Sequence, residues 1–100
     1  MTNVNTDTNA TYLLNVGDMF EVIAKVEERV TGVFDASLNR AAARALADAG
    51  YSLKPDNAAE TSESALFAIL VTVEHERSGV FRAALARTTA KALVEAGCSL

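Results

Sequence analysis

The chain has 100 residues, half of them hydrophobic, and a formal net charge of −4. This length suits one domain with a modest core, and one cysteine, Cys98, excludes an internal disulfide and a cysteine-only zinc cluster. The longest apolar run, residues 65–71, is far shorter than the roughly 20 residues of a membrane span. The polar N-terminus lacks the pattern of a secretory signal. We therefore expect a cytoplasmic protein with no membrane contact.

The chain opens with an Asn- and Thr-rich stretch, for which we expect a disordered tail over residues 1–10. Residues 11–100 are expected to form a single domain. The high alanine content and the excess of Arg over Lys indicate GC-rich coding, which points to a small bacterial or phage accessory protein.

One segment of the chain occurs twice. Residues 19–53 align with residues 66–100 without a gap, and 16 of the 35 aligned positions are identical. Residues 54–65 form the linker. A segment written twice predicts one supersecondary unit built twice about a pseudo-twofold axis.

Each copy begins with an ambiguous segment, residues 20–29 and 67–76. Apolar residues alternate in both, which predicts a strand with one buried face. A helix also fits the first copy. In the second copy, however, residues 69–73 are mostly β-branched, and Arg77 falls on the face that a helix would bury. We therefore favour strands.

A helix is expected next in each copy. Its apolar stripe runs from Phe34 to Ala49 in the first copy and from Phe81 to Ala96 in the second. Thr31 and Ser78 are expected as N-caps, and Gly50 and Gly97 as helix ends. Residues 51–53 and 98–100 then read as brief return strands.

These elements predict an α+β fold. A tandem βαβ repeat gives a ferredoxin-like sandwich, a four-stranded sheet with both helices on one face. The alternative is all-α: two helical hairpins, or two long helices interrupted at Gly32 and Gly79, packed as a small bundle.

The sequence offers no catalytic, cofactor-binding or metal-binding constellation. His75 is the only histidine, and for it and Cys98 we favour structural roles. Glu27 and Glu74, identical between the copies, suit solvent-facing positions or salt bridges with helix arginines better than a catalytic pair. A single Gly32 or Gly79 is too little for a phosphate loop.

Two surfaces could bind partners. A basic patch would use Arg40, Arg44, Arg82, Arg87 and Lys91, although ion pairs four residues apart explain several of these charges. Small residues on the helix faces opposite the stripe could let another helix approach closely: Ala36, Ala43, Ala47, Ala83, Ala90 and Val94.

These observations favour a non-enzymatic, self-associating protein-interaction or regulatory module, first of all a homodimer, that also binds a host or partner protein and carries no cofactor. The alternative is a nucleic-acid-binding protein that uses the Arg and Lys faces of its two helices. The acidic net charge makes nucleic acid the less favoured partner.

Overall fold

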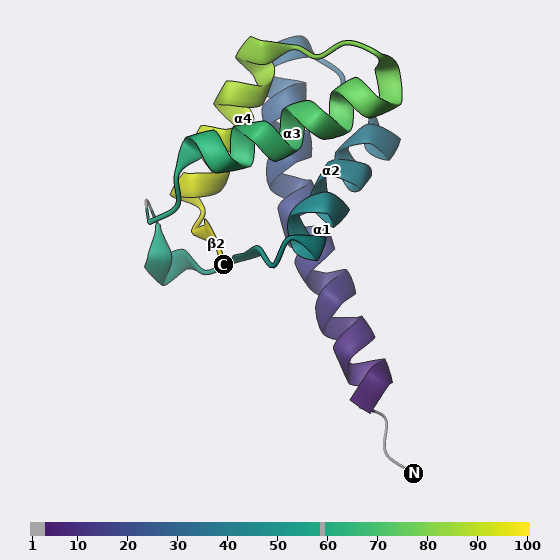
Figure 1. Cartoon of the computed structure of the whole chain (residues 1–100), viewed down its shortest axis with the longest axis vertical. Helices are drawn as coiled ribbons and strands as arrows, with labels where there is room; N and C mark the ends of the chain where they lie inside the picture. Colours follow the sequence, from purple (N-terminus) through teal and green to yellow (C-terminus); the bar gives the residue numbers. More distant parts are fainter. Residues whose placement is uncertain (1–3, 59) are drawn as a thin grey trace.

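A computed structural model describes residues 4–58 and 60–100, with side chains from Ala10 onward. In this part of the chain the helices are α1 (Val4–Thr31), α2 (Ala36–Asp48), α3 (Glu63–Ser78) and α4 (Ala83–Glu95). A short 3-10 helix, η1 (Pro55–Asn57), follows the strand β1 (Ser52–Leu53), and the strand β2 (Cys98–Ser99) lies next to the end of the chain (Figure 1). No helix among these residues is long and apolar enough to cross a membrane.

The helices form two hairpins, α1 with α2 and α3 with α4, and the hairpins pack together through α1 with α4 and α2 with α3. The two short strands pair antiparallel, with Ser52 opposite Ser99 and Leu53 opposite Cys98. The prediction of a tandem βαβ repeat and a ferredoxin-like sandwich is therefore wrong. The structure is a helical bundle, as in the all-α alternative of two helical hairpins.

Residues 20–29 and 67–76 belong to helices α1 and α3, which overturns their assignment as strands. In α1 the buried side chains of Met19, Ile23 and Val26 recur at helical spacing. In α3 the β-branched run packs partly buried against the core, so tertiary burial outweighs its strand propensity. Arg77 does not conflict with a helix, because it lies beyond the core and its Nη2 donates to Ser37 Oγ at 3.0 Å.

The core lies where all four helices and the strands meet. Its side chains come from both hairpins, and the largest that are fully buried are Met19, Leu46, Leu66, Leu93 and Cys98. The first and third helices thus supply as much of the centre as the second and fourth.

The two loops between helices do not use the predicted N-caps. Thr31 and Ser78 end α1 and α3, and their hydroxyls each lie 2.8 Å from the carbonyl oxygen four residues earlier, that of Glu27 and of Glu74. The N-cap of α2 is Asp35, whose carboxylate accepts from the Leu38 N–H at 3.1 Å.

The ends of α2 and α4 agree with the sequence. α2 is followed by Gly50 with φ +99°, and α4 by Gly97 with φ +90°, a conformation that glycine adopts at least cost. The brief strands β1 and β2 follow. The disordered tail was predicted for residues 1–10. Residues 1–3 lie outside the described residues, and residues 4–10 lie in α1, which begins at Val4. The linker over 54–65 includes η1.

Gly97→Ala is expected to destabilise the protein much more than Gly79→Ala. Both glycines have positive φ, but a Cβ at Gly97 would collide with the Lys54 carbonyl group, whereas one at Gly79 meets nothing within 4 Å. We expect a loss of about 1–2 kcal/mol for Gly79→Ala from backbone strain, and at least about 2 kcal/mol more for Gly97→Ala from the collision. Urea unfolding measures both, and equal losses would contradict the packing of β2 on η1.

Candidate functional site

The α1–α2 loop and the α3–α4 loop lie at the same end of the bundle (Figure 1). Exposed large hydrophobic side chains gather on these loops and the adjoining helix end: Val30, Val33, Phe34, Val80 and Phe81, each with 44–70% of its surface exposed. We call these five residues the loop-end surface. Val33-Phe34 and Val80-Phe81 occupy aligned positions, so the same apolar pair is exposed in both hairpins.

A buried carboxylate lies beneath this surface. Glu27 of α1 is only 3% exposed. Its Oε1 accepts from the backbone N–H of Asp35 at 2.9 Å and from Asn39 Nδ2 at 3.0 Å. Its Oε2 lies 2.9 Å from Arg82 Nη1. Donors from the first loop, α2 and the start of α4 therefore meet on one side chain.

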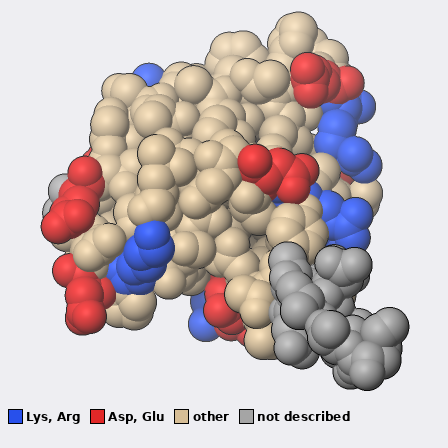
Figure 2. Space-filling view, turned by 60° about the horizontal axis from the view of Figure 1, so that its bottom comes forward, with Lys and Arg blue, Asp and Glu red and all other residues tan. Residues whose placement is uncertain are grey.

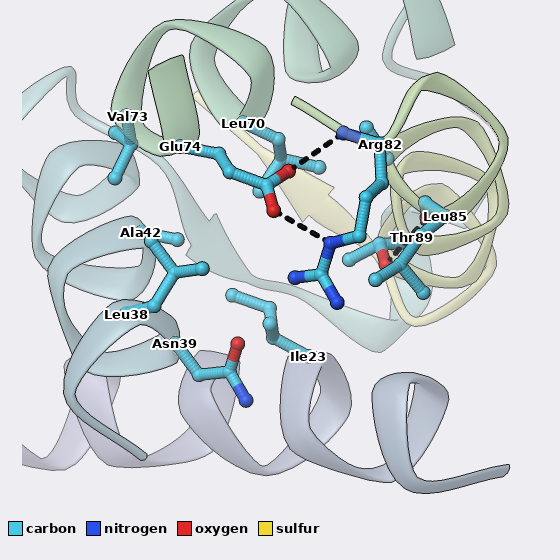
Figure 3. Close-up of a pocket in the computed structure, with 11 residues that line it drawn as sticks. Ile23, Leu38, Asn39, Ala42, Leu70, Val73, Glu74, Arg82, Leu85 and Thr89 are labelled. Carbon is cyan, nitrogen blue, oxygen red and sulfur yellow. Dashed lines mark hydrogen bonds and ion pairs between the residues drawn. The ribbon is translucent and has the colours of Figure 1, made fainter. Parts of the chain in front are cut away.

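Arg82 also binds the aligned carboxylate of the second hairpin. Glu74 Oε2 lies 2.6 Å from Arg82 Nε, and Glu74 Oε1 accepts from the Arg82 backbone N–H at 3.0 Å (Figure 3). One guanidinium thus joins a carboxylate of α1 to a carboxylate of α3. The sequence suggested either solvent-facing positions or salt bridges for the two glutamates, and the structure shows both in salt bridges with Arg82.

These contacts shift the pKa values of Glu27 and Arg82. Burial by itself would raise the pKa of Glu27, but the hydrogen bonds from Asp35, Asn39 and Arg82, with the Arg82 charge, hold that pKa below its ordinary value. Burial would lower the pKa of Arg82, and the two carboxylates raise it instead. Both groups are therefore held in their charged forms.

A small hollow of about 40 Å³ opens beside Arg82. Apolar side chains from all four helices line it, and Figure 3 shows Ile23, Leu38, Leu70 and Leu85 directed toward it. Ile23 aligns with Leu70, and Leu38 with Leu85, so the hollow lies between aligned positions of the two hairpins. Its volume is on the order of one or two water molecules, which is too little for a cofactor or a drug-sized substrate.

The structure does not bring the expected basic patch together. Arg40 and Arg44 line a groove with residues of α1, whereas Arg87 lines a separate groove with Phe67 of α3. The guanidiniums of Arg40 and Arg87 lie over the rings of Phe20 and Phe67, 5.0 and 5.1 Å from the ring centres.

The remaining two members of the patch differ in their surroundings. Arg82 is held by two glutamates, while Lys91 is exposed on α4. In the face drawn in Figure 2, charges of both signs are scattered and do not gather into one basic patch.

The small residues proposed as an interaction face do not form one surface. Ala43, Ala90 and Val94 are buried in the core, Ala47 is partly buried, and Ala36 and Ala83 are exposed at the helix starts. The buried side of α2 is rotated by about one residue from the expected stripe. Because alanines stand at 41, 42, 43, 45 and 47, apolar periodicity could not decide which of them face inward.

The remaining candidate residues, Cys98 and His75, have surroundings that fit structural roles. Cys98 is 1% exposed, its Sγ lies 3.9 Å from Met19 Sδ, and burial raises the pKa of its thiol to about 11. His75 is exposed, with its ring 6.3 Å from that of Phe81. Among the described residues no group of three His, Cys, Asp or Glu side chains is placed to hold a metal ion.

Comparison with protein-family models, with curated proteins and with solved structures finds no match for this chain.

Glu27→Gln is expected to cost about 2 kcal/mol of unfolding free energy, because Glu27 accepts three hydrogen bonds as a buried anion. Glu74→Gln is the matched control. It removes the aligned carboxylate, which has a single partner residue, and we expect a loss of about 1 kcal/mol or less. Chemical unfolding at pH 7 measures both losses.

The same variants test the pH dependence. Because the folded-state pKa of Glu27 lies below the ordinary value of 4.5, its contribution is present above pH 4.5 and is lost as pH falls through the lower folded pKa. Wild type should therefore lose stability more steeply in acid than Glu27→Gln does. Parallel pH profiles would contradict the network.

Proposed function

We propose that this protein is a non-enzymatic, self-associating protein-interaction module that binds an apolar segment of a partner protein at its loop-end surface. The observation that carries the proposal is the exposed Val-Phe pair at the same place in both hairpins. Large apolar side chains gathered at one end of a small domain are typical of a protein-binding site.

The supporting network makes the loop-end surface a rigid platform. The Asp35 N–H of the first loop and Arg82 of the second bind the same Glu27 carboxylate, so the two loops are held together. A preorganised apolar surface loses little conformational entropy on binding, which favours affinity. The hollow beside Leu38 and Leu85 could take the tip of one partner side chain.

The residues with the most reactive side chains support a binding role. The lowered pKa of Glu27 keeps it as the anion, and the raised pKa of Cys98 keeps it as the thiol at neutral pH. A general acid or base needs a pKa near the operating pH, and a nucleophilic cysteine needs a lowered one. The buried free thiol also suits a reducing, cytoplasmic setting.

The partner surface is tested by capture from the native host with the tagged full chain. We expect the wild type to retain a protein that the Val33→Ser/Val80→Ser variant loses, because that variant removes the two valines exposed to 70% and 67%. The effect expected is at least a tenfold loss of captured material. Circular dichroism should show an unchanged fold.

The matched control is Ala36→Ser/Ala83→Ser, which changes two exposed alanines at aligned helix starts, beside the surface but outside it. It should keep most of the capture. Equal capture by wild type and the Val33→Ser/Val80→Ser variant would contradict the proposal. A salt-dependent DNA or RNA shift that Arg87→Ala/Lys91→Ala abolishes would instead favour the nucleic-acid alternative.

A further inference from the structure

Helix α1 is twelve residues longer than α3, the helix with which it aligns. The aligned part begins at Val16, so residues 4–15 have no counterpart in the second hairpin. We call them the α1 extension. At 1.5 Å per residue the extension is about 18 Å long. In Figure 1 it projects past the other helices, at the end of the molecule opposite the loop-end surface.

Two described side chains of the extension bind the body of the bundle. Tyr12 Oη donates to the Asp48 carboxylate at 2.9 Å, and Asn15 Nδ2 donates to the Tyr51 carbonyl oxygen at 2.9 Å. The neighbouring Leu13 and Leu14 are 58% and 70% exposed. Two adjoining large apolar side chains exposed at the base of the extension form a surface on which a partner could pack.

A groove begins at the base of the extension. Leu13, Val16, Gly17 and Phe20 line it on α1, and Arg40 and Arg44 line it on α2, around a cavity of about 220 Å³. A Cβ built at Gly17 would have nothing within 4 Å, so the helix surface is open at this point. The aligned groove of the second hairpin has Glu63 and Ser64 where this one has Val16 and Gly17, so the first groove has an apolar side on α1 and the second has a more polar one on α3.

The charges around the groove are self-complementary. Arg40 and Arg44 flank it on α2, and Asp18 and Glu21 are exposed on α1. None of these four side chains forms an ion pair within the part of the chain that the structure describes. A second copy of α1 lying along the groove would bring acidic side chains to the two arginines, and twofold symmetry would form the same contacts twice.

We propose that two copies of this chain pair about a twofold axis through antiparallel α1 helices that cross near Gly17. Leu13 and Leu14 of each copy then cover the groove of the other, and Glu21 of each lies beside Arg44 of the other. The inference rests on the proposed function and names the occupant of its self-association surface. Both loop-end surfaces stay free in such a dimer, one at each far end.

Sedimentation velocity on the full chain over about 1–100 µM tests the pairing. Wild type should sediment at twice the 10.6 kDa chain mass. Leu13→Glu/Leu14→Glu should weaken the dimer at least a hundredfold, because each interface would bury four new carboxylates. These leucines are exposed, so circular dichroism and the midpoint of thermal unfolding should change little at low concentration.

The matched control lies at the other end of the molecule. Val33→Ser/Val80→Ser should leave the dimer intact, which separates this interface from the loop-end surface. A monomeric wild type, or a dimer that the leucine variant leaves unchanged, would overturn the inference. A monomeric wild type would also contradict the self-association in the proposed function, whereas a dimer that the leucine variant leaves unchanged would contradict this interface alone. Neither result would affect capture at the loop-end surface.

Charge reversal tests the orientation of the helices. Arg44→Glu and Glu21→Arg should each weaken the dimer about tenfold, and the two together in one chain should restore it, because each copy then supplies the reversed partner. Absence of this rescue would overturn the antiparallel arrangement.

Discussion

The carboxylate of Glu27 is the contact on which the arrangement of the bundle depends. A buried anion is costly unless donors replace water, and here the donors come from three different places in the chain: the Asp35 N–H, Asn39 and Arg82. The first two fix where α2 begins. The third ties α4, and through Glu74 also α3, to α1. Without this group the two hairpins would still share an apolar core and the hydrogen bond from Arg77 to Ser37, but no ion pair among the described residues would join them at the loop end.

The bundle has two ends of different character. At the loop end a charged network satisfies the buried carboxylate, and large apolar side chains stay partly exposed beside it. The opposite end carries the α1 extension, which only the first hairpin has. The two aligned segments thus form the bundle itself. The α1 extension, which has no counterpart in the second hairpin, distinguishes the two hairpins. In the proposed dimer the two apolar surfaces would lie at the two far ends, which suits a bivalent adaptor.

The sequence predicted parts of this structure well. Helices α2 and α4, their ends before Gly50 and Gly97, and the brief strands that follow were all evident, because glycine and amphipathic spacing are local signals. Whether residues 20–29 and 67–76 form strands or helices was not evident, since a buried β-branched run fits both. The sequence also did not indicate which alanines of α2 face the core. For Glu27 and Glu74 the sequence suggested salt bridges with helix arginines as one of two roles, but it did not indicate that Glu27 is buried or that both pair with Arg82. The second copy has Arg82 at the position where the first copy has Asp35. This difference was the signal that one guanidinium could bind both carboxylates.

A double-mutant cycle between Glu27 and Arg82 measures the central contact most directly. Unfolding free energies of wild type, Glu27→Gln, Arg82→Met and the double variant give the coupling energy between the two side chains. The account predicts a coupling of about 1–3 kcal/mol, as for contacting charged residues in one network. A coupling below about 0.3 kcal/mol would contradict it, because the two hairpins would then be held together without this contact.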